Sequence, residues 1–194
     1  MKAFKHLRTV IKHKSYVLKY CFRAGLYLQG IFHDMSKFSP TEFLVGIKYY
    51  QGDKSPNSAE RLDKGVSYSW LHHKGRNKHH IEYWLDFSLK EGAPIVGMRI
   101  PEKYVVEMAF DRIAASRVYQ KEAYTDKSAY IYYEKGKSHL VMEEQSQKLL
   151  ENILQKLADE GEEAMIAYIK TQVLSGNKGI YYKNVKGENK ENDR

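Results

Sequence analysis

The stretch "IFHDMSKFSP", residues 31–40, places His33 and Asp34 side by side, with Lys37 three positions later. Adjacent side chains cannot share one face of a helix as residues four apart can. We therefore expect the helix to end or bend here, so that both side chains turn toward one point. A metal ion at that point is one interpretation, and a polar turn that binds nothing is the other.

The segments on either side of this stretch follow a helical pattern. Apolar residues in 3–28 recur at spacings of three, four and seven, which predicts an amphipathic helix. Ser39, Pro40 and Glu42 are typical of a helix start, with Ser39 as the cap, Pro40 at the first helical position and Glu42 completing a capping box. We expect this second helix to run to about Tyr50.

The rest of the chain also favours helices. The pattern predicts four more of them, over residues 66–90, 101–120, 138–160 and 161–174. Two segments, 51–58 and 123–138, are expected to be a loop and a less regular, tyrosine-rich stretch. No segment keeps the alternation of a strand for more than a few residues. The sequence therefore predicts an all-α protein.

Composition limits the class of protein. The chain has 194 residues, which suits one ordinary domain, and its 42% hydrophobic and 29% charged residues are typical of a globular protein. No apolar run approaches 18 residues, so no membrane span is expected. The single cysteine, Cys21, cannot form an internal disulfide, which favours a cytoplasmic location. A net charge of +8 favours anionic partners such as nucleotides, phosphate esters or nucleic acid.

Histidines are concentrated in the first 80 residues. Four of them, His72, His73, His79 and His80, fall within nine positions. On a continuous helix, residues seven apart lie nearly on one line. His72 with His79, or His73 with His80, would then point the same way and could face the interior together. The alternative is a basic helix face with solvated histidines.

Two further side chains fall where they can reach the interior. His13 lies at the edge of the apolar face of its predicted helix, and Asp111 falls among the apolar residues of another. A buried carboxylate needs a cation or strong hydrogen bonds. A salt bridge from Asp111 to Arg112, Arg117 or Lys103 would supply them without any ligand. The alternative for His13 is likewise a hydrogen bond to a neighbour.

The order of these residues resembles that of the metal ligands in the HD-domain metal-dependent phosphohydrolases. In that family a histidine of an early helix, an adjacent His-Asp pair and a late aspartate hold a divalent metal in an all-helical fold. "HDMSK" at 33–37 is similar to the family's His-Asp-x-x-Lys stretch, and "FDRIAA" at 110–115 to its late Asp-Arg segment. The histidine-rich segment between them is similar to that of members that bind a second metal.

The pattern also resembles a small uncharacterised bacterial and phage family with an HD-like signature, in which "HDMSKFSPTEF" and "NKHHIEYW" would be typical. The resemblance covers about residues 6–120. His6 remains a rival of His13 for the first ligand, because the gap from His13 to His33 is short. Residues 138–194 have no counterpart in the resemblance.

The resemblance implies a fold, a domain organisation and a ligand set. We expect an HD-domain-like helical bundle over residues 1–135, a C-terminal helical extension over 136–175 that packs on it, and a flexible tail over 176–194. The expected cofactor is a divalent ion, one of Mn, Fe, Co, Ni, Zn or Mg, because imidazole, carboxylate and water suit these ions. The expected metal ligands are His13, His33, Asp34, His73, His79, His80 and Asp111.

The activity that the resemblance implies is metal-dependent hydrolysis of a nucleotide or related phosphoester. Asp34 is expected to carry charge beside the metal and assist proton transfer, and Lys37 to neutralise the phosphoryl oxygens. Arg76, Asn77 and Arg112 are the further candidates for contacts with substrate. The alternative is a basic module on a degenerate HD scaffold that binds nucleic acid, with its many tyrosines stacking on bases, or binds another protein.

Overall fold

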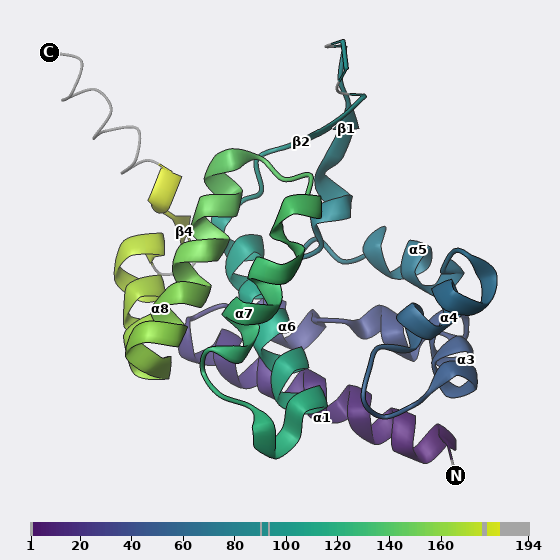
Figure 1. Ribbon diagram of the computed structural model, residues 1–194. Coiled ribbons are helices and arrows are strands. Elements are labelled where there is room, and N and C mark those ends of the chain that lie inside the picture. Colours follow the sequence, from purple (N-terminus) through teal and green to yellow (C-terminus); the bar gives the residue numbers. More distant parts are fainter. Residues whose placement is uncertain (1, 90, 93, 176–177, 183–194) are drawn as a thin grey trace, which may run out of the picture.

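The computed structural model describes residues 2–89, 91–92, 94–175 and 178–182. Eight α-helices account for most of these residues, which confirms the predicted all-α class (Figure 1). Among the described residues, no helix combines the length and the apolar character needed to cross a lipid bilayer.

Three long helices form the core. They are α1 (Lys2–Arg23), α6 (Glu102–Gln120) and α8 (Glu144–Tyr168), and α6 contacts both of the others. The two faces of α6 are apolar, so Phe110 stacks on Tyr20 of α1 with ring centroids 5.3 Å apart, while Leu150 and Leu154 of α8 are fully buried in the same cluster. The helix that carries Asp111 is therefore fixed by packing on both sides.

Short helices cover the N-terminal half of this core. They are α2 (Tyr27–Phe32), the 3₁₀ turn η1 (Met35–Phe38), α3 (Pro40–Tyr49), α4 (Pro56–Lys64) and α5 (Tyr68–Lys74). Figure 1 shows α3, α4 and α5 grouped on one side of the molecule, close to the N-terminal end of α1. This layer brings the His33-Asp34 turn and the histidine-rich segment toward the middle of α1.

The remaining elements complete the C-terminal half. The helix α7 (Ser128–Gly136) packs on α6 and α8, and the π-helical turn η5 (Ile169–Val173) follows α8. Strands β1 (Leu85–Phe87) and β2 (Ile95–Gly97) pair antiparallel, as do β3 (Leu174–Ser175) and β4 (Lys178–Gly179). The 3₁₀ turns are η2 (Ile81–Trp84), η3 (Lys121–Ala123) and η4 (Lys137–His139).

The first predicted helix is shorter than expected. It ends at Arg23 because Gly25 adopts a left-handed conformation, φ 81°, which favours glycine and closes the helix. The chain then turns back along α1 as α2. A Cβ atom at Gly30 would lie 2.9 Å from Cys21 Cβ, so the two helices approach closely at that glycine. The reversal places His33 beside His13.

The predicted helix over 66–90 is wrong. The helix α5 stops at Lys74, and the chain continues as a turn, then η2, then strand β1. The Asn77 side-chain amide donates to the carbonyl of His73, 2.8 Å away, and so satisfies an acceptor that a continuing helix would use. His79 and His80 therefore come from a turn, and the stripes expected on one continuous helix do not exist. The β1–β2 hairpin has strands of only three residues each, which agrees with the prediction that no segment keeps a strand's alternation for long.

The C-terminal boundaries agree with the prediction only in part. The predicted boundary between helices 138–160 and 161–174 is confirmed, because the backbone of α8 leaves the helical conformation at Gly161, φ 84°, and the chain kinks there. The first of these two helices begins at Glu144 and not at residue 138, and the second gives way to η5 after Tyr168. Helices α4 and α7 begin or lie in the segments 51–58 and 123–138, which were expected to be irregular. Of the predicted tail over 176–194, residues 178–182 are described: β4 pairs with β3, and Tyr182 Oη donates to the carbonyl of Ile100 at 2.8 Å. The other tail residues lie outside the described part.

Candidate metal centre

Four of the predicted ligands converge where α1, the end of α2 and α6 meet. One ligand atom from each of His13, His33, Asp34 and Asp111 lies within 4.8 Å of all the others. Asp111 Oδ1 is 3.0 Å from His13 Nε2 and 3.5 Å from His33 Nε2. Asp111 thus faces imidazoles, and no ion pair joins it to an arginine or lysine among the described residues. We call this set the first group.

The backbone between α2 and η1 makes the convergence of His33 and Asp34 possible. His33 ends α2 with φ −50° and ψ 127°, and Asp34 is left-handed with φ 54° and ψ 25°. Aspartate tolerates this region better than most residues do. Lys14 Nζ donates to the carbonyls of Ile31 and His33, each at 2.7 Å, and so ties the turn to α1. Both side chains are consequently buried.

A second group of potential ligands shares Asp34 with the first. It consists of Asp34, His73, His79 and His80, again with one atom of each within 4.8 Å of the others. Asp34 Oδ1 lies 3.3 Å from His73 Nε2 and 3.4 Å from His79 Nε2. All three histidines predicted from the histidine-rich segment are therefore brought to the His33-Asp34 turn.

Several buried atoms of this cluster have no hydrogen-bond partner. They are both carboxylate oxygens of Asp34, His79 Nε2 and His80 Nε2. The Lys37 ammonium makes an ion pair with Asp34, Nζ to Oδ2 3.1 Å, but this leaves the imidazole nitrogens unpaired. Since more than nine-tenths of buried polar groups in proteins are paired, so many unpaired atoms that face one point suit a bound cation. Imidazole and carboxylate donors fit a divalent transition-metal ion or Mg²⁺.

Two glutamates that the sequence analysis did not identify accept hydrogen bonds from the Nδ1 atoms of these histidines. Glu107 Oε1 is 2.9 Å from His33 Nδ1 and 3.1 Å from His79 Nδ1. A carboxylate can only accept here, so both Nδ1 atoms donate to Glu107 and both Nε2 atoms face Asp34. Metal-binding histidines in proteins are usually oriented in this way. Glu107 lies one helical turn before Asp111, and that spacing is the one signal that could have found it.

Glu42 plays the same part for the second group. Its two oxygens lie 2.6 Å from His72 Nδ1 and 2.8 Å from His73 Nδ1. The predicted capping box is therefore wrong: the Ser39 side chain makes no capping hydrogen bond, and Glu42 is engaged by α5. Pro40 does occupy the first turn of α3, as predicted. His72 pairs with Glu42 and lies in neither group.

The charges of the cluster favour a cation. Burial raises the pKa of Asp34, but His33, Lys37 and His73 outweigh it and hold the pKa well below its usual range. Burial lowers the pKa of His79, but Asp34 and Glu107 outweigh it and raise the pKa to about 10. Burial and the neighbouring His79 lower the pKa of His80 well below its ordinary value, so its imidazole is neutral and free to bind a metal.

The other candidate residues occupy different surroundings. Asn77 is buried, and its amide donates to Ser36 Oγ and the His73 carbonyl, so it holds the turn in place. Arg76 is exposed and donates to the His72 carbonyl. Arg112 is half-buried beside Asp111, and its Nε atom has no hydrogen-bond partner. His6, the rival of His13, packs between Phe43 and Tyr50 and lies outside both groups.

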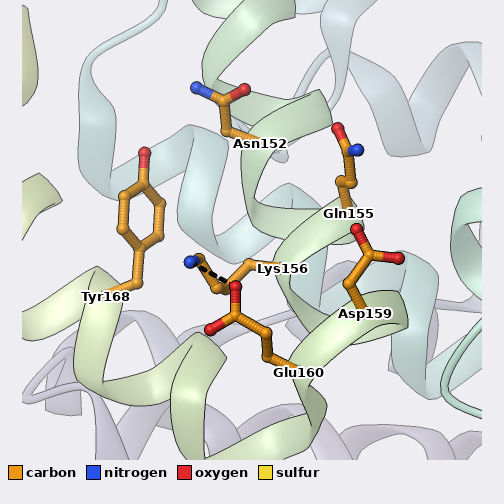
Figure 2. Close-up of a pocket in the computed structure, with 6 residues that line it drawn as sticks. All are labelled: Asn152, Gln155, Lys156, Asp159, Glu160 and Tyr168. Atoms are coloured by element: carbon orange, nitrogen blue, oxygen red, sulfur yellow. Dashed lines mark hydrogen bonds and ion pairs between the residues drawn. The ribbon is translucent and has the colours of Figure 1, made fainter.

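Two cavities differ in their relation to the cluster. The first, about 280 Å³, lies on α8 and is lined by Asn152, Gln155, Lys156, Asp159, Glu160 and Tyr168 (Figure 2). Lys156 and Glu160 neutralise each other there, Nζ to Oε1 2.6 Å, and no residue of either group lines it. The second, about 320 Å³, is lined by His79, Asn77 and Glu107 among others, so it adjoins the metal-binding cluster.

No curated protein and no solved structure matches the chain. One family model does match, over residues 2–156, and that range includes every residue of both groups and both supporting glutamates. The chain therefore belongs to the DUF5662 family, which is described as a family of unknown function.

Proposed function

We propose that the protein is a metal-dependent phosphohydrolase that acts on a nucleotide or a related phosphoester. The observation that carries the proposal is Asp34: it is buried, belongs to both groups of potential ligands, and its two oxygens face imidazole nitrogens and the Lys37 ammonium instead of backbone or hydroxyl donors. A carboxylate in that position could contribute a ligand oxygen to either group of histidines. The order of these residues along the chain, which resembles that of the HD-domain enzymes, supports the same reading.

The side chains have two proposed roles: metal ligands, and carboxylates that orient the ligand histidines. His13, His33 and Asp111 would hold one ion, and His73, His79 and His80 the other, with Asp34 contributing to both. Divalent ions in such a site polarise a phosphoryl group and lower the pKa of bound water toward about 7. The depressed pKa of Asp34 keeps its carboxylate ionised at neutral pH.

Lys37 would contact the substrate. Its ammonium lies 3.1 Å from Asp34 Oδ2 and is partly exposed, so it can also reach an anion at the cluster. Burial lowers the pKa of Lys37, but Asp34 and Asp111 outweigh it and raise the pKa, so the charge is kept at neutral pH. Such a cation stabilises the charge that develops on non-bridging phosphoryl oxygens.

The alternative is a binding module for nucleic acid or protein on a degenerate HD scaffold. The net charge of +8 favours a nucleic-acid partner. A degenerate scaffold, however, would be expected to lack some of the ligands. Here seven side chains and two supporting carboxylates are all in place, which favours the enzyme.

Metal content and metal-dependent turnover test the proposal directly. The protein, purified without chelator or histidine tag, should carry at least one equivalent of divalent metal by mass spectrometry. It should hydrolyse members of a nucleotide panel with added Mn²⁺, Co²⁺ or Ni²⁺, and the activity should vanish with chelator. His13→Gln should lower both metal content and turnover, whereas His139→Gln, an exposed histidine far from both groups in sequence, should change neither.

The opposite outcome is equally clear. A protein that binds no metal, hydrolyses no nucleotide and binds single-stranded RNA with an affinity that falls steeply with salt would contradict the proposal. That result would favour the nucleic-acid module.

A further inference from the structure

The second cavity is a cleft of about 320 Å³ beside the second group, and nothing described so far uses most of it. Its size falls at the lower end of the range for small-molecule sites. His79 lies in its wall, so whatever binds there lies next to the candidate metal centre. Apart from Gln29, Asn77 and Glu107, the other side chains in the wall are of two kinds, cations and apolar or aromatic groups.

The cleft carries an excess of positive charge. Arg76, Lys78 and Lys103 all line it, and among the described residues none of the three makes an ion pair with a carboxylate. The one carboxylate in the lining is Glu107, which is engaged by His33 and His79. No carboxylate of the described residues therefore balances the charge of these three cations, and the complementary ligand is an anion.

An aromatic and apolar surface lies beside these cations. Lys103 Nζ and Lys78 Nζ are 5.1 and 5.9 Å from the centroid of the Tyr104 ring. Helix α2 adds Leu28 and Phe32 to the lining, with exposed fractions of 62% and 66%. A surface of this kind suits a flat ring, because rings stack on aromatic side chains and shed water from apolar ones.

We propose that this cleft binds a nucleoside di- or triphosphate. The base packs against Tyr104 and the apolar residues of α2, and the phosphates pair with Arg76, Lys78 and Lys103. Three cations match a ligand with more than one phosphate charge better than a sugar monophosphate. The proposal names the substrate class of the proposed function and rests on that function for the reaction, but the binding itself needs no metal.

Binding of ADP to the metal-free protein tests this assignment. In the presence of chelator, calorimetry should show that ADP binds more tightly than inorganic phosphate does. The double variant Lys78→Glu/Lys103→Glu should bind ADP at least about tenfold more weakly, because each reversal replaces attraction by repulsion. Tyr104→Leu should weaken binding about five- to 100-fold, on the scale of one base stacked on an aromatic ring.

A matched control separates the cleft from net charge. Lys148→Glu/Lys170→Glu reverses two exposed lysines on α8 and η5, outside the cleft lining, and should bind ADP as the unaltered protein does. Circular dichroism checks that each variant keeps its helices. Equal loss in the control and the cleft variant would overturn the proposal, as would ADP binding no tighter than phosphate.

The remaining outcomes distinguish this proposal from the function on which it rests. Metal-dependent hydrolysis without ADP binding to the metal-free protein would overturn the cleft assignment and leave the hydrolase standing. ADP binding by a protein that holds no metal and hydrolyses nothing would support the cleft assignment and overturn the hydrolase. A single-stranded oligonucleotide that binds far more tightly than ADP, with steep salt dependence, would assign the cleft to nucleic acid and overturn the small-molecule assignment.

Discussion

Glu60 and Asp34 are both buried carboxylates, with exposed fractions of 0% and 1%, but only Glu60 is surrounded by hydrogen-bond donors. Glu60 Oε2 accepts from the Ser67 hydroxyl at 2.7 Å and from the Ser69 hydroxyl and backbone N–H at 2.8 and 3.3 Å, while Lys64 reaches its other oxygen at 3.1 Å. Asp34 has only the Lys37 ion pair and the edges of neighbouring imidazoles.

The two carboxylates differ in how completely the protein itself compensates their buried charge. A buried charge with a full set of donors is complete within the protein and holds α4 to the start of α5. A buried charge that lacks donors costs free energy unless something else supplies them. Asp34 faces imidazole edges and one ammonium instead, and in our proposal a metal ion completes this arrangement.

The largest expected effect comes from Asp34→Asn. The change keeps the shape and removes the charge shared by both groups, so we expect loss of metal and a fall in hydrolysis of about 10²-fold or more. Metal analysis and turnover measure it, with circular dichroism to show that the helices remain. Glu60→Gln is the matched control and should keep both metal and rate. An Asp34→Asn variant with its metal and full activity would make the two carboxylates equivalent and break the comparison.

The supporting glutamates sharpen the comparison, because they act on one group or on both. Glu107→Gln should weaken the binding of both ions about 10- to 100-fold, since Glu107 orients His33 of the first group and His79 of the second. Glu42→Gln should weaken one ion alone, through His73. Stepwise titration with Co²⁺, followed by visible absorbance, resolves the two ions. Equal effects of the two variants would show that the groups are not separate.

Removal of metal should affect stability through Asp34 and not through Glu60. An ion at about 100 times its dissociation constant stabilises the folded state by about 2.7 kcal/mol, or about 5–10 °C in melting temperature for a chain of this length. Thermal unfolding with and without chelator should show this shift in the unaltered protein and in Glu60→Gln. Asp34→Asn should melt at the same temperature in both conditions, and a chelator effect in that variant would contradict the assignment.

The smallest effect is the acid stability that Glu60 provides. Burial raises the pKa of Glu60, but the donors from Ser67, Ser69 and Lys64 outweigh it and lower the pKa from 4.5 to about 2. A folded pKa below the unfolded one contributes stability above pH 4.5 that is lost as the pH falls toward 2. Glu60→Gln should lower the urea midpoint at pH 7 and show a smaller further loss between pH 4.5 and 2. If Glu60→Gln lost as much stability between pH 4.5 and 2 as the unaltered protein does, Glu60 would not be the source of this acid stability.

Helical periodicity predicted that His13 and Asp111 lie near the interior, and the resemblance to the HD-domain family grouped them with His33 and Asp34 as expected ligands. His13 and Asp111 lie on long, regular helices, where position in the sequence determines the direction of the side chain. The break between His33 and Asp34 was expected for a similar reason, since adjacent residues on a helix diverge. The all-α class follows from the same patterns.

The rest depends on contacts that no local pattern encodes. His79 and His80 reach the cluster from a turn that Asn77 holds through the His73 carbonyl and through Ser36, some 40 residues away in the chain. Glu107 and Glu42 resemble ordinary helix residues until their partners, 74 and 31 positions away, are known. The sequence therefore predicted which types of residue form the cluster. It did not predict the turn that brings His79 and His80 to it.

The left-handed backbone of Asp34, φ 54°, also bears on how this chain can change through mutation. Asparagine tolerates that conformation as well as aspartate does, and a single nucleotide change connects the two. Glutamate, although it would keep the charge, would strain the turn and move the carboxylate. Glutamate, the replacement that keeps the charge, would therefore disturb the backbone of the turn more than asparagine would. If the proposed function holds, a descendant of this protein could lose its metal and keep its shape in one step.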